Sequence, residues 1–498
     1  MTEKNPTHSA GRASGHAAIA AAAKKLLGFT SLRPGQEEAI RALLNGRDTV
    51  VVQPTGSGKS AIYQIAGALL PGSTVIVSPL IALQKDQAEA IESSHLEEAV
   101  VVNSTLSASE RRETLERVEG GEVEYIFLAP EQLKKTETLE RLRTAGISLF
   151  AIDEAHCISH WGHDFRPDYL DLGHAIEAVG HPPVLAITAT ASREVRRDIV
   201  GRLGLRNPRV LVRGFDRPNI SLRVDTYASA DEKGDALLRR IEFAEKPGIV
   251  YVATHKNAET IAADLQQRGI SALAYHGGMK AKDRDEIQNR FMTGEVAVIV
   301  ATNAFGMGVD KADIRFVYHA DVSDSLDSYY QEIGRAGRDG KPAEAVLFFR
   351  PRDIGAQKYK TGAGNIDTAE LESVATALTS REEPATPQDL GRATSLSPRK
   401  VANIVHKLEE VGAARRTELG EIEAVTGEPV SAIAEAAAQQ QEQQREVRRE
   451  HLEQMREYAT SRNCRREFLL RYFGDDYEGP CGNCDCCEQA GAAGRQVA

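Results

Sequence analysis

The residues best suited to chemistry form a glycine-rich segment between an apolar run and a helical pattern. Glycines there let backbone amides converge on phosphate oxygens, and the start of the following helix adds a positive dipole. Lys59 supplies a positive charge, and the Ser60 hydroxyl is a ligand that Mg²⁺ accepts. A glycine-rich surface turn would not need a lysine and a serine at a helix start. The segment therefore predicts a phosphate-binding loop, made of Gln53, Pro54, Thr55, Gly56, Ser57, Gly58, Lys59 and Ser60.

A pair of acidic residues follows the apolar run from Leu149 to Ile152. Asp153 can hold the coordination shell of Mg²⁺, and Glu154 can orient or deprotonate the water that attacks the terminal phosphate. Two acids facing solvent at a helix start would look the same in isolation. Their place downstream of a phosphate-binding loop favours the first interpretation, so we expect an ATP hydrolase that uses Mg²⁺.

Two arginines, Arg335 and Arg338, lie about one helical turn apart and could share one face. If a second domain closes on ATP, both guanidinium groups can approach the triphosphate from the far side and stabilise the charge that develops there. A solvated basic face is the alternative. The neighbouring Gly334 and Gly337 allow close approach, which favours a pair of arginine fingers.

Five of the six cysteines lie between Cys464 and Cys487, whereas Cys157 stands alone. This crowding, in a chain without an export signal, favours a metal site over disulfides. Four of the cysteines have spacings of sixteen, two and two intervening residues, which suits four thiolates around a tetrahedral Zn²⁺. We expect Cys486 to be a bystander. The predicted ligands are Cys464, Cys481, Cys484 and Cys487.

Short β-branched runs alternate with helical patterns in two successive stretches, which is the rhythm of open, mostly parallel α/β sheets. The first stretch predicts strands at residues 49–52, 74–78, 125–129, 148–153 and 184–188. The second predicts strands at residues 248–253, 272–275, 296–301, 316–320 and 344–349. Between them, Asp216 to Asn219 combines turn-forming residues with a proline and is a candidate hinge or linker.

The strand rhythm stops beyond about Asp353. Residues 384–416 have the spacing of a helix-turn-helix, in which Ser397-Pro398 begins the second helix and Gly412 ends it. We expect a short wing to continue to about Val425. Residues 431–461 contain almost no glycine or proline and are rich in Ala, Gln, Glu and Arg, which predicts a long polar helix.

These segments, together with Thr188-Ala189-Thr190 and the run from Ala301 to Asp310, resemble superfamily 2 helicases and occur in the same order. The segments at residues 27–36 and 157–167 further resemble the RecQ family of DNA helicases, as does the cysteine cluster with Tyr472-Phe473-Gly474. The resemblance covers about residues 23–355 and returns at residues 464–487.

The RecQ resemblance implies ATP, Mg²⁺ and Zn²⁺ as cofactors and assigns further roles. Arg33 and Gln36 would read adenine, and Asp310 would approach the ribose. Trp161, the only tryptophan, has polar neighbours that argue against burial, and it offers a stacking face for bases. The residues that would couple DNA contact to hydrolysis are His156, Trp161, Phe165 and Arg166.

We therefore expect an α/β protein with two RecA-like parallel-sheet domains, a helical winged-helix-like module and a small zinc-binding module. In most RecQ proteins the zinc module directly follows the motor, whereas here a helix-turn-helix lies between them. The expected parts are a disordered tail (1–22), the first RecA-like domain (23–215), the second (216–355), a linker (356–383), a winged helix-turn-helix-like module (384–425), a long helix with the zinc module (426–487) and a disordered tail (488–498).

The helix-turn-helix offers a second candidate contact with DNA. Arg399 and Lys400 add two cations to the positive end of its second helix, which predicts contact with phosphate and no choice of base sequence. A packing module that merely spaces the motor from the cysteines is the alternative. The formal net charge of −11 predicts that DNA contact is local and salt-sensitive.

The RecQ resemblance implies a DNA-stimulated ATPase that translocates 3′ to 5′ and unwinds duplex DNA in repair or recombination. Its partners would be single-stranded DNA and duplex junctions. The alternatives are an ATP-driven remodeller or annealing motor with weak unwinding, an RNA helicase, and a DNA-binding regulator with an inactive motor. No apolar run is long enough to cross a bilayer and no export signal is present, so we expect a cytoplasmic protein, with a monomer favoured.

Overall fold

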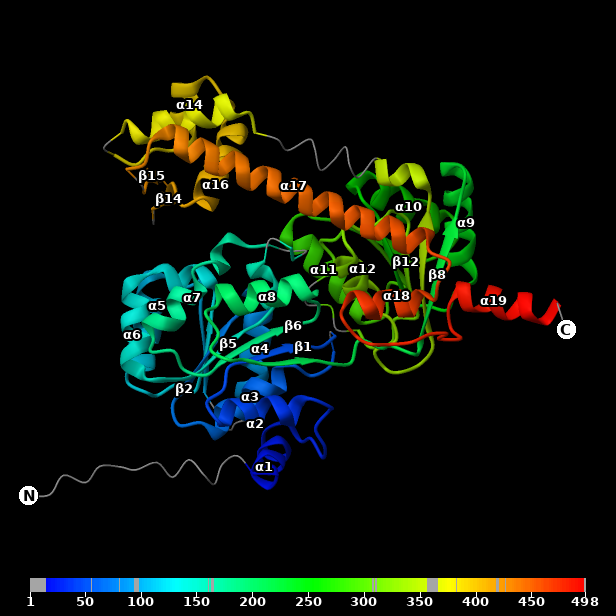
Figure 1. Ribbon diagram of the computed structural model, residues 1–498, viewed down its shortest axis with the longest axis horizontal. Coiled ribbons are helices and arrows are strands. Elements are labelled where there is room, and N and C mark those ends of the chain that lie inside the picture. The colour runs from blue at the N-terminus through cyan, green and yellow to red at the C-terminus, as the bar shows by residue number, and fades with distance from the viewer. Residues whose placement is uncertain are drawn as a thin grey trace, which may run out of the picture. The chain divides into compact units, whose positions relative to one another are not determined.

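The structure is a computed structural model that describes residues 15–54, 56–79, 81–93, 98–159, 161–162, 165–306, 309, 311–355, 366–381, 383–417, 421–425 and 427–496. It divides into two compact units. The first comprises Met1–Arg350 with Glu457–Ala498, and the second comprises Pro351–Arg456. Figure 1 labels many of the elements of both units. Among the described helices, none combines the length and the apolar character that crossing a bilayer requires.

Domain 1, the first half of unit 1, is built on a parallel sheet with the strand order β3-β4-β2-β5-β6-β1-β7. Its central strands are short apolar runs that are buried on both faces, as parallel strands between two layers of helices must be. The strands are β1 (Thr49–Val52), β2 (Ser73–Val77), β3 (Ala99–Val102), β4 (Tyr125–Leu128), β5 (Ile147–Ile152), β6 (Val184–Thr188) and β7 (Arg209–Val212).

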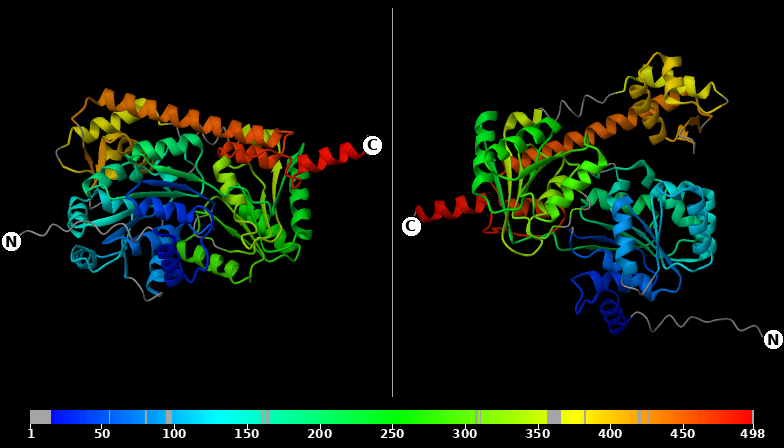
Figure 2. Two further views of the ribbon diagram at one scale, coloured as in Figure 1. Left: turned by 60° about the horizontal axis from the view of Figure 1, so that its bottom comes forward. Right: turned by 180° about the vertical axis from the view of Figure 1, so that it is seen from behind.

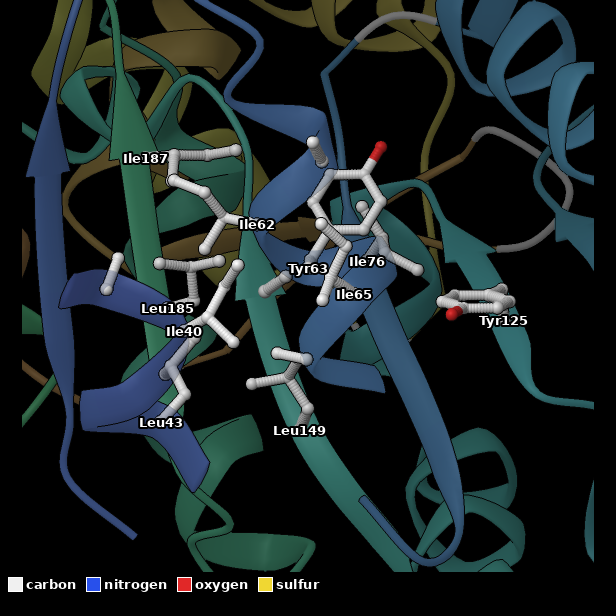
Figure 3. Packing of buried hydrophobic residues seen from close by; sticks show 14 of the residues in the cluster. Ile40, Leu43, Ile62, Tyr63, Ile65, Ile76, Tyr125, Leu149, Leu185 and Ile187 are labelled. Atoms are coloured by element: carbon white, nitrogen blue, oxygen red, sulfur yellow. The ribbon is translucent and has the colours of Figure 1, made fainter. Parts of the chain in front are cut away.

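Helices and 3₁₀ turns precede and connect these strands. They are α1 (His16–Leu27), α2 (Gln36–Leu44), α3 (Ser60–Leu69), α4 (Ile81–Ser93), α5 (Ala108–Glu119), η1 (Pro130–Lys134), α6 (Thr136–Ala145), η2 (Ala155–Ile158), η3 (Pro167–Tyr169), α7 (Leu172–Ala178) and α8 (Arg193–Arg202). Figure 3 shows the core between the sheet and α2 and α3, where Ile40 and Leu43 meet Ile62, Leu185 and Leu149. This core fixes the start of α3, which carries the end of the phosphate-binding loop.

Domain 2 repeats the architecture with the strand order β10-β11-β9-β12-β13-β8. Its strands are β8 (Ile220–Thr226), β9 (Gly248–Tyr251), β10 (Ala272–Tyr275), β11 (Val298–Ala301), β12 (Phe316–His319) and β13 (Ala343–Phe349). The accompanying helices are α9 (Ala230–Phe243), α10 (His255–Gln267), α11 (Ala281–Met292) and α12 (Leu326–Ile333). The two parallel sheets confirm the predicted fold class. β3, β7 and β8 were not predicted.

The C-terminal segment returns to unit 1 as the cysteine module, which we define as residues 464–496. It contains α18 (Arg465–Tyr472) and α19 (Asp485–Gln496). The backbone of Cys484 forms a parallel β-bridge with Leu222 of β8. Figure 2 shows α18 and α19 beside domain 2 in both views. The module is therefore anchored to the edge of the second sheet.

In the described part of unit 2, three short helices, the first part of a long helix and a two-stranded antiparallel hairpin surround one apolar core. Ser397 caps the second helix of the predicted helix-turn-helix by accepting a hydrogen bond from the Lys400 amide, and Pro398 occupies its first position. The hairpin occupies the place of the predicted wing. The elements are α14 (Thr368–Thr379), α15 (Pro387–Thr394), α16 (Pro398–Glu410), β14 (Ala414–Arg416), β15 (Ile422–Ala424) and the long helix α17 (Val430–Thr460), which continues into unit 1.

Three expected boundaries are wrong. Residues 16–22, expected in a disordered tail, belong to α1, because Ile19 packs into the domain 1 core. Residues 368–379, expected in a linker, form α14 and contribute Leu371 and Val374 to the unit 2 core. Residues 488–496, expected in the C-terminal tail, continue α19. In the first two cases a few apolar residues in a polar or alanine-rich stretch supply the packing that orders the helix.

Candidate ATP site and cysteine cluster

The phosphate-binding loop connects the buried strand β1 to α3, as its sequence predicts. Gly56 and Gly58 have φ angles of +79° and +80°, which glycine adopts without strain. The Lys59 ammonium donates to the carbonyl oxygens of Gln53 at 2.9 Å and Pro54 at 3.2 Å. Burial lowers the pKa of Lys59, although the neighbouring carboxylates oppose this shift. Thr55 lies outside the described residues.

Arg33 and Gln36, which the family resemblance assigns to adenine, brace this loop from the start of α2. The Arg33 guanidinium donates to the Gly56 carbonyl. Gln36 is 1% exposed; its side-chain nitrogen donates to the Gly58 carbonyl at 2.8 Å, and its side-chain oxygen accepts from the Arg33 amide at 2.7 Å. A Cβ on Gly58 would lie 2.8 Å from the Gln36 nitrogen, so a larger residue would displace this brace.

The acid pair lies at the end of β5. Asp153 is 6% exposed, and its amide donates to the carbonyl of Val77 at 2.8 Å. Burial raises the pKa of Asp153 to about 7, with a further rise from Glu154 and an opposing effect of Lys59. Glu154 has a φ of +48°, a conformation that L-residues rarely adopt and that is found at functional sites. The backbone therefore directs two adjacent carboxylates toward the lysine of the phosphate-binding loop.

His156 links the acid pair to the next strand. Its Nδ1 lies 3.3 Å from a carboxylate oxygen of Glu154 and 2.8 Å from the hydroxyl of Thr188 at the end of β6. Burial alone would lower the pKa of His156, but Cys157 and Glu154 raise it well above its usual value. The resemblance includes Thr188 in a motif but assigns it no role. Its contact with His156 identifies it as part of the site.

The segment after η2 folds back onto the acid pair. A Cβ on Gly162 would lie 2.3 Å from the carbonyl oxygen of His156, so only glycine permits this approach. Trp161 is half-buried, and Arg166 donates to the carbonyl of Pro79 at 2.9 Å. Phe165 is also half-buried. Of the predicted DNA-coupling residues, His156 is therefore buried beside the acid pair, whereas Trp161, Phe165 and Arg166 are only partly buried.

The two predicted arginine fingers occupy different environments. Helix α12 ends at Ile333, and Gly337 has a φ of +55°, so Arg335 and Arg338 lie in turns. The expectation that they share one helical face is therefore wrong. Arg338 extends from domain 2 toward the phosphate-binding loop, where its Cδ would lie 3.5 Å from a Cβ on Gly56. Arg335 is 3% exposed. Asp310, the predicted ribose contact, lies outside the described residues.

The four predicted metal ligands converge. The sulfur atoms of Cys464, Cys481, Cys484 and Cys487 all lie within 4.8 Å of one another. Among the described residues, these four form the group of side chains that could hold a metal ion. Four thiolates around a tetrahedral Zn²⁺ at about 2.3 Å would be separated by about 3.8 Å, so the donor set fits zinc. The sulfur of Cys486 is instead directed to the carbonyl of Ser461, at 3.8 Å. This arrangement agrees with Cys486 as a bystander.

The second candidate DNA contact lies by itself on unit 2. Arg399 is exposed at the start of α16. The Lys400 ammonium forms an ion pair with Glu370 of α14, which neutralises part of the predicted positive end. His406, further along the same helix, lies within 4 Å of the carboxylates of Glu409 and Glu410. The face is therefore less basic than its first two cations suggest.

Two RecA-like domains, with an ATP-type loop on one and an arginine of the other directed at it, define the class of nucleic acid helicases. Sequence models of three families match the chain: DEAD/DEAH box helicase at residues 33–198, helicase conserved C-terminal domain at residues 232–340 and RecQ zinc-binding at residues 428–488. The chain is 37% identical over 468 residues to the probable ATP-dependent DNA helicase RecS of Bacillus subtilis, which covers 94% of this chain and 90% of that protein. The chain belongs to the RecQ family of ATP-dependent DNA helicases.

Further relatives define the extent of the match. The ATP-dependent DNA helicase RecQ of Haemophilus influenzae is 36% identical over 466 residues, which covers 93% of this chain but 62% of that protein. In the Mycobacterium smegmatis helicase Lhr, solved with ssDNA and AMP-PNP, the match has a TM-score of 0.51 and 19% identity and covers 82% of this chain and 60% of that one. The last similarity concerns the fold alone.

Proposed function

We propose that this protein is an ATP-dependent DNA helicase that translocates 3′ to 5′ along one strand and unwinds duplex DNA in repair or recombination. The observation that carries the proposal is the position of Arg338, which reaches from domain 2 to Gly56 of the phosphate-binding loop. An ATPase whose two halves share one nucleotide couples hydrolysis to opening and closing of those halves. Membership of the RecQ family supports DNA as the track.

The site residues divide the work of phosphoryl transfer. Lys59 and the loop amides bind the β- and γ-phosphates, and Ser60 with Asp153 would hold Mg²⁺, which neutralises phosphate charge when bound. Glu154 accepts the proton of the attacking water, and Arg338 stabilises charge on the transferred group. Arg335 would act as a second arginine finger on the same phosphate group.

Two further groups of residues would recognise the nucleotide and couple the site to DNA. Arg33 and Gln36, which brace the loop, would read adenine, and Asp310 would complete the nucleotide contacts at the ribose. His156 connects the acid pair to Thr188, and the segment with Trp161 packs on the His156 carbonyl. DNA that moves this segment would therefore act on Glu154 through two short contacts.

The test is strand separation on tailed duplexes. The protein with ATP and Mg²⁺ should displace a strand from a duplex with a 3′ single-stranded tail, and not from one with a 5′ tail. Glu154→Gln is the matched control, because it keeps the size of the side chain and removes the base. Strand annealing without displacement would favour the annealing motor, and stronger ATPase stimulation by RNA than by DNA would favour an RNA helicase.

A further inference from the structure

Residues 216–219, whose sequence makes them a candidate hinge or linker between the two sheet domains, are held by hydrogen bonds from the cysteine module. The carbonyl of Arg217 accepts a hydrogen bond from the Arg466 guanidinium at 3.0 Å. The carbonyl of Pro218 accepts from the side-chain amide of Asn483 at 3.0 Å. Both donors belong to the cysteine module. Because of these two hydrogen bonds, we expect this segment to move together with the cysteine module and not to act as a hinge.

Arg217 extends from this linker to the turn that carries the arginine finger. Its guanidinium donates to the carbonyls of Gly334 at 3.0 Å, Ala336 at 2.8 Å and Gly337 at 3.0 Å. The turn follows the end of α12, so no helix orders these three carbonyls. The planar guanidinium of arginine holds several acceptors in a fixed arrangement, which lysine cannot reproduce. The turn leads directly to Arg338.

The cysteine module holds the linker by buried contacts. The rings of Phe473 and Phe215 are stacked, with centroids 4.6 Å apart and planes 6° from parallel. Arg466 is 5% exposed, donates to the Ile220 carbonyl at 2.7 Å and lies 3.2 Å from the Asp216 carboxylate. The Arg466 guanidinium is buried although the Asp216 side chain is partly exposed, so removing its partners would leave a buried charge unpaired. The linker is therefore tied to α18.

The link continues to the cysteine cluster itself. Asn483 lies between Cys481 and Cys484, and its carbonyl accepts from the Leu222 amide at 3.3 Å. Its side chain is the one that binds the Pro218 carbonyl. The loop that positions two thiol groups therefore also positions the linker and the first strand of domain 2.

We propose that Arg217 is a positioning residue for ATP hydrolysis. It holds the turn that presents Arg338 to the phosphate-binding loop, and the cysteine module holds the linker from which Arg217 extends. This inference rests on the proposed function, because it requires Arg338 to act on the triphosphate. Loosening the turn lowers the rate, since displacement of a reacting group by about 1 Å costs up to about 100-fold.

The first test is steady-state ATP hydrolysis by the full-length chain. Arg217→Ala should lower kcat about tenfold while KM and nucleotide affinity stay near wild type, which is the pattern of a lost transition-state interaction. Arg217→Lys should recover part of the loss. The control is Arg206→Ala, because Arg206 forms an exposed ion pair with Glu177 at 2.8 Å in domain 1. A wild-type kcat in Arg217→Ala, or an equal loss in Arg206→Ala, overturns the inference.

A double-mutant cycle separates this inference from the proposed function. Arg217→Ala should cost little more in an Arg338→Ala background, because the two residues act in series. Additive losses would overturn the positioning role. If Arg338→Ala hydrolyses ATP at the wild-type rate, the proposed role of Arg338 is wrong. If Arg338→Ala is impaired and Arg217→Ala is not, only the further inference is wrong.

A last test concerns the cysteine module and uses readouts other than activity. Arg466→Ala should retain its zinc, because Arg466 is not a ligand, and should increase amide hydrogen exchange at residues 334–338. Phe473→Leu, which keeps an apolar side chain without the stack on Phe215, should do the same to a smaller extent. Wild-type exchange in both variants, with hydrolysis unchanged, would contradict the link from the module to the finger.

Discussion

The ATP site of unit 1 and the exposed face of α16 in unit 2 are both predicted from short sequence motifs. They differ in how many hydrogen bonds within the protein hold their side chains in place. At the ATP site, Lys59 is held by two carbonyls and Gln36 is 1% exposed with bonds on both ends of its amide. On α16, Arg399 is exposed and Lys400 is bonded to Glu370. A site ordered before its ligand arrives loses little entropy on binding. Substitutions at the ATP site should therefore cost far more than substitutions on α16.

The largest effect is expected at Glu154. Glu154→Gln should lower the rate of ATP hydrolysis by about 100- to 10,000-fold, because general base catalysis contributes on this scale. ATP binding should persist, since the phosphate contacts of Lys59 remain. The measurement is single-turnover hydrolysis beside nucleotide affinity. Comparable hydrolysis by wild type and Glu154→Gln would show that Glu154 is not the general base. It would also remove the largest expected difference between substitutions at the ATP site and on α16.

The cysteine cluster should show the second largest effect. The protein should carry about one zinc per chain, and Cys484→Ser should lose the metal and several kcal/mol of stability, because binding of a structural zinc is coupled to folding. Cys486→Ser is the matched control and should be nearly silent, since its sulfur points to Ser461. Metal analysis and thermal unfolding give the answer. Zinc retained by Cys484→Ser would require a different ligand set.

Half-buried Trp161 should give an intermediate effect. Trp161→Ala should lower DNA stimulation of the ATPase about tenfold, which corresponds to a coupling free energy on the order of 1–2 kcal/mol. DNA affinity should fall by a smaller factor, because other contacts remain, and Arg166→Ala should behave in the same way. ATPase titrations with single-stranded DNA measure both quantities. Full stimulation in both variants would show that this segment does not couple DNA to hydrolysis.

The smallest effect is expected on α16. Arg399→Ala combined with Lys400→Ala should lower duplex affinity a few-fold and reduce the salt slope by about 1, the value for one lost phosphate contact. One contact is expected, not two, because Lys400 is paired with Glu370. Stimulation by single-stranded DNA should survive. An unchanged affinity and slope would indicate that unit 2 spaces the motor from the cysteines.

The phosphate-binding loop and the cysteine cluster could be predicted from the sequence because their residues are close together along the chain. The phosphate-binding loop is one run of eight residues, and three of the four cysteines span seven. The finger turn was harder. The spacing of Arg335 and Arg338 suggests a helix, but α12 ends at Ile333. The glycines at 334 and 337 are compatible with a helix end, but the sequence alone does not show that the helix ends there.

Contacts between distant segments could not be predicted. Arg217 and Arg466 are 249 positions apart, and nothing in either neighbourhood identifies the other. The missed strand β7 is an edge strand whose Arg209 and Val210 are exposed, so its apolar pattern is incomplete. Thr188 was recognised only as part of a motif. Its bond to His156 depends on the pairing of β5 with β6, which the sequence alone does not show.

The β-bridge between Cys484 and β8 has a consequence for biosynthesis. β8 is the edge strand of the second sheet, and unpaired edges attract other strands and promote aggregation. The groups that cover it arrive late, because Val224 and the Asp485 side chain that it contacts are 261 positions apart. At about 5–20 residues per second, a ribosome needs roughly 10 to 50 seconds to reach them. Once β13 has been made, the nascent second domain presents β8 as an unpaired edge until the cysteine module is complete and contacts it.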